Sequence, residues 1–453
     1  MNAVKIALLG TAALAAVSVS AQASETSDLI AQMEALNSRI AALESAPSMP
    51  AGYQLLSVST TDAIIIPGLD SVKDKNYGKK AHNIGIMPTA DVPASTNIQW
   101  SGFVRVGLVH KSGRSSTTAT NISGAAIAAV APAPGFLVGE TLADFTTDPA
   151  AVGALARAKA RTKSFDVVSR AGLKVVGTTD TAVGEVGVRI ALLASVEAIG
   201  GTNRSHDSAV ASDGYWGWWK ITPELTLGGG VDGSLANSSN AFDNRCSCAY
   251  IDTGGAFGRG DPTQLRLSYA SGPISFAVAL EDERNDGTKS ALGFAGEMKY
   301  SGDTIGFDLN AGYWDSKSNV PTFSDSAWTV NAGANMALGD IANLGVAVGV
   351  GEDKNLQGNL DSYAKASVFL GFTLSDAVTA ELGGAYTDYK GSSSSSTIGA
   401  GLYYTPVSQL TLGLEASYSK NKNVATGLNS TGTIVSRTSS KSTVVDAIAI
   451  WRF

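Results

Sequence analysis

The chain ends on residues 446–453, "DAIAIWRF", in which apolar side chains alternate with others up to the last residue. In a β-strand, Ala447, Ala449, Trp451 and Phe453 would lie on one face and Arg452 on the other. Chain ends are usually loose and polar. An aromatic residue that closes an alternating stretch therefore indicates a strand whose face is either buried in a core or in contact with something apolar outside the protein.

The N-terminus indicates export. Lys5 precedes the apolar run "IALLGTAALAAVSV", and Ala21-Gln22-Ala23 has the small-x-small form of a signal-peptidase site. The run is too short for a transmembrane helix, the alternative interpretation, and it lacks a stop-transfer flank. We predict a signal peptide over residues 1–23 and a mature chain that begins at Ser24.

Composition narrows the class of protein. Charged residues make up only 16% of the 453 residues, the formal net charge is −7, the mean hydropathy is +0.08, and there are 50 glycines. No segment after residue 23 is long and apolar enough for a membrane helix, and no basic block suggests nucleic-acid binding. This combination fits a membrane β-barrel, and a secreted soluble β-protein is the alternative.

From residue 97 onward the hydrophobic period is two. The sequence predicts sixteen strands near residues 98–110, 165–178, 183–196, 215–222, 225–232, 263–270, 274–283, 290–300, 304–315, 327–338, 344–352, 362–374, 378–389, 397–405, 410–420 and 442–453. Short links such as "TTDT" and "SGD" alternate with longer polar ones. Outer-membrane barrels sort their connections in this way, because the two ends of each hairpin lie in different compartments.

The two faces of these strands differ in polarity. In residues 410–418, "LTLGLEASY", Leu412 and Leu414 share one face with a terminal Tyr418, while Thr411 and Glu415 lie on the other. Such a pattern suits a lipid-facing surface with an aromatic girdle around a wet lumen. We predict an all-β fold, a 16-stranded antiparallel transmembrane β-barrel over residues 97–453. In the last strand, Val444, Ile448 and Ile450 make the inward face more apolar than a wet lumen requires.

The region before the barrel is predicted to consist of a helix and a linker. Within residues 24–46, Leu29, Met33, Leu36, Ile40 and Leu43 follow the 4-3-4-3 spacing of a short coiled coil, although a lone amphipathic helix on the barrel mouth also fits. Residues 47–96 are predicted to be a linker or periplasmic segment with one strand near "DAIIIPG" (residues 62–68). Within the first long loop, we predict a further helix over residues 149–161, begun by Asp148-Pro149.

In three features the sequence resembles the bacterial porin superfamily, and within it the alphaproteobacterial, rhizobial-like porins most closely. They are "IQWSGFVRVGL" (residues 98–108), the sixteen hairpin-linked strands and the terminal "IAIWRF"; "IIIPG" (residues 64–68) is similar to an element that precedes the first strand in rhizobial-type porins. The resemblance implies a homotrimer in the outer membrane of a Gram-negative bacterium, in contact with lipid and lipopolysaccharide. The N-terminal helix looks like the coiled coil of some trimeric specific porins, and it is a candidate contact with peptidoglycan.

In porins the loop after the fifth strand folds into the lumen, and here that loop would be residues 233–262. Side chains at the narrowest ring set the selectivity of a pore. The expected pore-lining set combines a basic wall with this charged loop: Arg105, Arg170, Lys174, Arg189 and Arg266 on the wall, and Asp243, Arg245, Asp252 and Arg259 in the loop. The alternative is that these charges have no role in selectivity: they are hydrated in a water-filled lumen and pair among themselves.

The only two cysteines, Cys246 and Cys248, lie at the centre of this loop. An envelope compartment favours a disulfide, but a bridge across two residues is strained, so a free pair or a soft-metal site stays open.

Passive diffusion of small hydrophilic solutes is the expected function. A substrate-selective channel and a structural envelope anchor are the alternatives. The three histidines lie beside no nucleophile motif, so we expect no enzyme, no cofactor and no metal.

Overall fold

The computed structural model describes residues 56–64, 66, 69, 77–87, 95–121, 155–196, 210–250, 261–282, 292–317, 324–354, 360–390, 393–429 and 432–453. The predicted signal peptide and the predicted coiled-coil helix of residues 24–46 lie outside these ranges.

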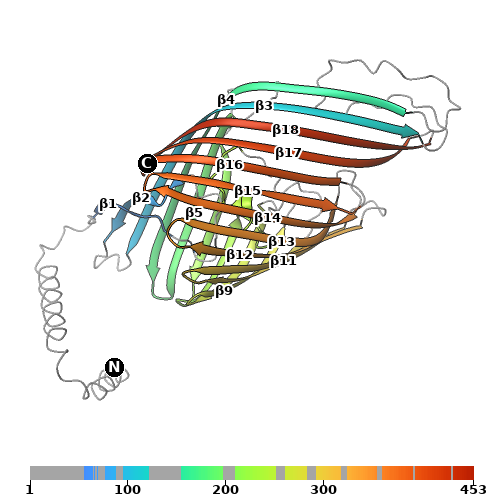
Figure 1. The fold of residues 1–453 in the computed structure, drawn as a ribbon. Helices are drawn as coiled ribbons and strands as arrows, with labels where there is room; N and C mark the ends of the chain where they lie inside the picture. Colours follow the sequence, from blue (N-terminus) through green and yellow to red (C-terminus); the bar gives the residue numbers. More distant parts are fainter. Residues whose placement is uncertain are drawn as a thin grey trace, which may run out of the picture. The chain divides into compact units, whose positions relative to one another are not determined.

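Sixteen antiparallel strands, β3 to β18, form a closed barrel, as predicted (Figure 1). Each strand pairs with its neighbour in the chain, and β18 pairs with β3 from Arg452↔Phe103 to Ile434↔Asn121, which closes the cylinder. The barrel strands are β3 (Thr96–Asn121), β4 (Leu155–Thr181), β5 (Gly184–Val196), β6 (Ala211–Lys220), β7 (Leu225–Val231), β8 (Thr263–Ser271), β9 (Ile274–Asp282), β10 (Leu292–Ser301), β11 (Ile305–Lys317), β12 (Ser324–Leu338), β13 (Ala342–Lys354), β14 (Leu360–Ser375), β15 (Val378–Tyr389), β16 (Ser393–Val407), β17 (Leu410–Asn429) and β18 (Gly432–Arg452).

The two faces of the barrel wall follow the predicted alternation. In β17, Leu412 and Leu414 point outward and are 41% and 59% exposed, whereas Glu415 points inward and is 2% exposed. Trp451 and Phe453 lie on the outer face. An apolar outer surface around a polar interior is the arrangement of a membrane-spanning barrel. No helix within the described ranges is long and apolar enough to cross a membrane.

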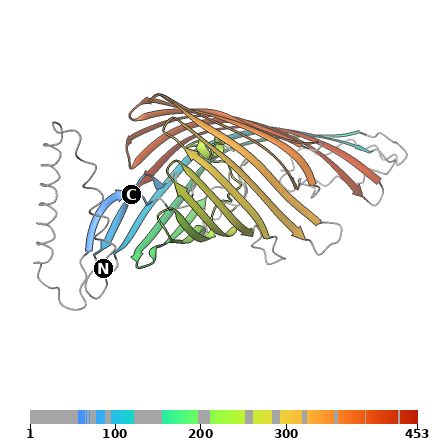
Figure 2. The same cartoon turned by 90° about the horizontal axis from the view of Figure 1, so that it is seen from below.

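The links at one end of the barrel are all short, whereas most links at the other end are longer, except those between β15 and β16 and between β17 and β18. The barrel therefore has a short-turn end and a long-loop end. The C-terminus lies at the short-turn end, near β1 and β2 (Figures 1 and 2). Four strands, β3, β4, β17 and β18, have 20 to 27 residues each, and they project far past the others at the long-loop end. A membrane needs only about 9–11 residues of a tilted strand.

The predicted helix over residues 149–161 is wrong in its described part. Leu155 and the residues after it belong to β4 and pair with β3, from Thr120↔Leu155 to Arg114↔Arg161. The segment "ARAKARTK" (residues 156–163) alternates alanine or threonine with basic residues, a period of two that suits a strand. Residues 149–154 lie outside the described ranges.

Two strands precede the barrel where one was predicted. They are β1 (Leu56–Asp62) and β2 (Lys80–Ile86), which pair with each other. Of the described residues of the expected strand at residues 62–68, which are 62–64 and 66, only Asp62 belongs to a strand. β2 also pairs with the start of β3, from His82↔Trp100 to Ile86↔Thr96, immediately beyond the last pair of β18. β2 therefore continues the line of β18 at the short-turn end.

The connector between β1 and β2 enters the barrel. Ile66 is buried among Val176, Trp216 and Trp218, which point inward from β4 and β6. The backbone N–H of Ile64 donates to Gln99 Oε1 at 2.8 Å, and Gln99 points inward from β3. The described part of the connector therefore covers the inner wall on the β3–β6 side.

Candidate channel and constriction loop

Residues 232–250 leave β7 and run along the inner wall of successive strands. The short helix α3 (Phe242–Arg245) lies in the middle of this segment, inside the ring of strands (Figure 2). Asn331 of β12 donates to Ala236 O at 2.6 Å, and Phe242 N donates to Ser367 Oγ of β14 at 2.7 Å. The loop predicted to fold into the lumen thus lies against the wall throughout its described part.

Three glutamates of the wall hold the loop. Glu281 of β9 accepts hydrogen bonds from Ser234 Oγ at 2.8 Å and Leu235 N at 3.0 Å. Glu381 of β15 accepts from the N and Oγ of Ser247, at 2.7 and 2.8 Å. Carboxylates make the stronger, charge-assisted kind of hydrogen bond to backbone N–H groups.

The third glutamate, Glu415 of β17, fixes the end of the described loop. It accepts hydrogen bonds from Ala249 N at 2.8 Å, Tyr250 N at 3.1 Å and Tyr403 Oη at 3.1 Å. The three glutamates lie on β9, β15 and β17, so they distribute the attachment of the loop over much of the circumference.

Inward glycines let the loop lie close to the wall. A Cβ atom on Gly383 would come within 2.6 Å of the Phe242 ring, because that ring of α3 packs directly against the β15 backbone. A larger residue at this position would displace α3 toward the lumen.

The structure places the predicted basic wall residues inside the barrel, and most are covered. Arg189 of β5 forms a 2.6 Å ion pair with Asp232, and the two side chains are 0% and 4% exposed. Arg266 of β8 donates to Gly233 O at 2.9 Å. The guanidinium of Arg105 lies 4.7 Å from the centre of the Tyr250 ring. These arginines contact the loop itself, so they anchor it and do not face it across open water.

The other two predicted wall residues lie on β4. Lys174 is buried, and its Nζ lies 5.1 Å from the centre of the Tyr77 ring, at the end of the β1–β2 connector. Arg170 is half-buried, and its Cα is the cross-strand partner of the Cα of Arg105. The connector, which the sequence interpretation left outside the barrel, therefore covers part of the basic wall.

The predicted charges of the loop are only partly described. Asp252 and Arg259 lie outside the described ranges, and Asp243 is placed in α3 by its backbone alone. Arg245 lies at the C-terminal end of α3 and donates to Asn240 Oδ1 at 3.1 Å and to Asn343 Oδ1 at 3.5 Å. Arg245 borders a cavity.

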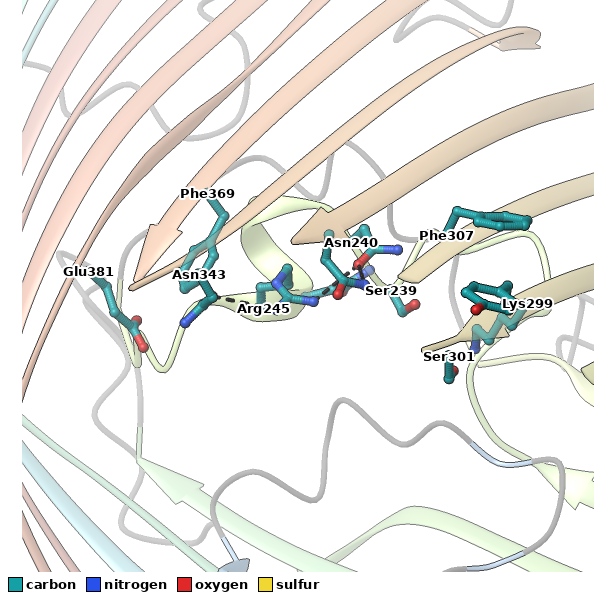
Figure 3. A pocket seen from close by; sticks show the side chains of 12 residues that line it. Ser239, Asn240, Arg245, Lys299, Ser301, Phe307, Asn343, Phe369 and Glu381 are labelled. Carbon is teal, nitrogen blue, oxygen red and sulfur yellow. Dashed lines mark hydrogen bonds between the residues drawn. The ribbon is translucent and has the colours of Figure 1, made fainter. Parts of the chain in front are cut away.

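A cavity of about 460 Å³ lies beside α3. Figure 3 shows Arg245 of α3 and Asn240 of the segment that precedes α3 reaching into it, with Asn343 and Glu381 from the wall. Its lining is mostly amides, hydroxyls and charges, with some aromatic rings: Ser239, Asn240, Asn244, Arg245, Lys299, Tyr300, Ser301, Phe307, Asn335, Asn343, Phe369 and Glu381. Such a surface can exchange hydrogen bonds with a hydrated polar solute.

Cys246 and Cys248 are joined as a disulfide directly after α3, with their Cα atoms 5.2 Å apart. Cys246 packs with Phe242 and Phe369, which places the pair at the point where the loop turns from β14 toward Glu381 of β15. No group of three or more His, Cys, Asp or Glu side chains is arranged to hold a metal ion within the described part of the chain.

The apolar inward face of β18 has a structural explanation. Val444, Ile448 and Ile450 form a buried cluster with Tyr250 of the loop and Tyr77 of the connector. Both inserted segments thus bring aromatic rings to the inner wall, and these rings remove the apolar side chains from water.

No family model matches the sequence, and no curated protein matches it. Solved structures match the fold. The outer membrane channel DcaP of Acinetobacter baumannii has a TM-score of 0.50 at 14% identity, over 81% of this chain and 99% of that chain. The fold is that of a bacterial porin. The anion-selective porin from Comamonas acidovorans (TM-score 0.49, 14% identity, 78% and 99% covered) and OmpT of Vibrio cholerae (0.48, 10%, 79% and 98%) also match.

Several residues of the site in this porin fold escaped the sequence analysis. Glu281, Glu381 and Glu415 are single acids on inward faces whose other residues are mostly small or carry a hydroxyl group. The signal was their position on the inward phase of a strand, where an isolated carboxylate needs donors. Their partners are mainly backbone N–H groups of a loop, which no side-chain pattern in the sequence reveals.

Proposed function

We propose that the chain forms a water-filled channel in the outer membrane of a Gram-negative bacterium, through which small hydrophilic solutes and ions diffuse passively. The observation that carries this proposal is the closed 16-stranded barrel with an apolar outer face, whose interior is narrowed by residues 232–250. A barrel of this size encloses an aqueous channel. The proposed role is transport, with no catalytic step.

In this proposal, the solute path runs past the cavity beside α3. Asn240, Asn343 and Arg245 border that cavity from the loop and the wall, and Lys299 and Glu381 add one charge of each sign. On the opposite side, the connector at Ile66 and the loop contacts of Arg189 and Arg266 occupy the wall of β3–β8.

Further parts of the proposal concern assembly. We infer a homotrimer of the alphaproteobacterial porin type, exported by a signal peptide over residues 1–23, with residues 24–46 as a coiled coil that contacts peptidoglycan. The support is the sequence pattern of these segments and the resemblance of residues 97–453 to such porins. Chemical crosslinking of the purified mature protein tests the trimer, since a monomer alone would contradict it.

A substrate-selective channel is the second candidate. The observation that favours it is the density of amide groups beside Arg245 in the cavity, since four asparagines line it. Solutes that carry a carboxylate and several hydroxyl groups would find donors there.

Single-channel recording in planar bilayers tests both candidates. Passive diffusion predicts large, steady conductance steps that rise in proportion to salt concentration. Block of these steps by a micromolar solute would indicate the selective channel. Absence of any step from folded protein would refute both.

A further inference from the structure

The disulfide of the loop joins Cys246 and Cys248, the only two cysteines of the chain. A single residue, Ser247, separates them, and both belong to the loop. A crosslink stabilises a fold mainly by closing a loop of the unfolded chain, and the effect is smallest for short loops. The bond does not link the loop to the wall either. Its role therefore lies elsewhere than in the stability of the barrel.

The loop is attached to the wall on both sides of these three residues, which we call the loop tip (residues 246–248). Before the tip, Phe242 N donates to Ser367 Oγ of β14 at 2.7 Å. After the tip, Ala249 N donates to Glu415 of β17 at 2.8 Å. Opening of the disulfide would therefore release the loop tip alone and leave the rest of the loop in place.

The two sulfur atoms differ in accessibility and in electrostatic surroundings. Cys246 is 2% exposed and packs with Phe242 and Phe369. Cys248 is only half-buried. Its backbone N–H donates to Cys246 Sγ at 3.1 Å, and such a donor stabilises negative charge on that sulfur. Because a more stable thiolate departs faster in an exchange reaction, the geometry favours attack at Cys248 with Cys246 as the leaving group.

A second cavity reaches the loop tip from the short-turn end. Its volume is about 760 Å³, and exposed Ser247 lines it together with Thr379 of β15, Tyr403 of β16 and Thr411 of β17. Sites for small molecules commonly have volumes of about 300–1,000 Å³, so this cavity can hold a small organic thiol. The loop tip can therefore be approached through the lumen.

We propose that the Cys246–Cys248 disulfide is a site of thiol–disulfide exchange with small thiols in the lumen, and that its state sets the ion selectivity of the channel. A thiolate attacks Cys248 Sγ and forms a mixed disulfide, while the S–S bond breaks and Cys246 leaves as a thiolate. A second thiolate attacks the sulfur of the bound thiol, which departs as a disulfide of the two small thiols and leaves Cys248 as a thiolate. Both protein thiolates take protons from water. Two small thiols are thus oxidised, and the protein disulfide gains two electrons and two protons.

Ser247 connects the state of the loop tip to the charge of the channel. Its N and Oγ donate to Glu381 at 2.7 and 2.8 Å, and Glu381 also borders the cavity beside α3. The disulfide ring holds Ser247 on this carboxylate. In the dithiol form Ser247 can leave it, so the charge of Glu381 becomes exposed to passing ions. Reduction should then favour cations, because side chains at the narrowest part of a pore set its selectivity.

The first measurement follows the exchange reaction itself, by mass spectrometry of the full mature chain folded in detergent. Reduced glutathione is the probe, and iodoacetamide then marks each free thiol. We expect both cysteines to be marked in the folded protein, at a rate within about tenfold of that in urea, because reactivity follows access to the sulfur. The transient glutathione adduct should lie on Cys248. A folded protein that stays unmarked, under conditions that mark it in urea, would overturn the proposal.

The second measurement is the reversal potential in a salt gradient across a planar bilayer. Glutathione should raise the cation-to-anion permeability ratio about twofold, because one carboxylate is added to the ion path. Reoxidation should restore the initial ratio. The double variant with Cys246→Ser and Cys248→Ser should show the raised ratio from the start and should not respond to glutathione. Glu381→Gln should be reduced as the unaltered protein is, with less than about half of the shift.

The unaltered protein with and without glutathione carries this test even if a variant does not fold. An unchanged permeability ratio in protein whose two thiols have been marked would overturn the proposed control of selectivity, as would a full response of the double serine variant. The effect on ions rests on the proposed channel function, but the exchange reaction does not. Protein that exchanges thiols and shows no conductance steps would therefore contradict the channel and support the exchange site.

Discussion

The buried ion pair between Arg189 and Asp232 should be a principal anchor of the loop of residues 232–250. The two groups are 2.6 Å apart and almost fully buried. At an effective dielectric constant of about 20, the Coulomb attraction at this distance is about 6 kcal/mol, much of it offset by desolvation. Arg189→Met leaves Asp232 buried without its cation, so we expect the free energy of unfolding to fall by about 3–5 kcal/mol. The double variant with Asp232→Asn should recover most of this loss.

Denaturant titration of the full chain in lipid vesicles, followed by tryptophan fluorescence, measures these differences. The pair of Lys80 and Asp62 is a matched control, because its 2.6 Å distance is the same but its side chains are 58% and 82% exposed. Lys80→Met should have no measurable effect. If the effects of the two substitutions at Arg189 and Asp232 simply add, the pair does not anchor the loop and the reasoning fails.

Three further predictions concern the pore and the barrel surface. Arg245→Gln removes a cation from the cavity wall and should shift the reversal potential in a salt gradient toward cation selectivity; an unchanged potential would place Arg245 away from the ion path. Ile66→Asn should loosen the connector and raise single-channel conductance, whereas Val58→Asn on the exposed face of β1 should not; equal conductances would argue that the connector does not narrow the lumen. Leu414→Arg on the lipid-facing side should cost about 2–4 kcal/mol in vesicles, and a neutral result would contradict contact with acyl chains there.

The sequence predicts the barrel strands well because their pattern is set by two solvents. Each strand touches lipid on one face and the interior on the other, and a period of two records this directly, as in residues 410–418. The predicted helix at residues 149–161 failed because caps and terminal cations fit a helix, while "ARAKARTK" fits the long β4 equally well. There, pairing with β3 determined the structure and the local helix propensity did not.

The interior was harder to predict than the wall. The loop of residues 232–250 was placed in the lumen from the resemblance to porins, but its attachment to Glu281, Glu381 and Glu415 depends on contacts 46 to 166 residues apart in the chain. The segments that enter the barrel left one trace in the sequence. Trp216 and Trp218, which cover Ile66, and the inward side of β18, which packs with Tyr77 and Tyr250, are too apolar for a wet lumen. Such inward apolar residues indicate that another segment covers them.

The connector also constrains how the barrel can be assembled. Its residues precede β3 in the chain, yet Tyr77 packs against Phe103 and lies over Gly172, where a Cβ atom would come within 2.7 Å of the Tyr77 hydroxyl. Once β18 has joined β3, bulky side chains could reach this place only through an open end of the barrel. The connector must therefore pack against β3 and β4 before β18 pairs with β3, or enter the closed barrel afterwards. The pairing of the first and last barrel strands thus constrains the order of steps in which this protein folds.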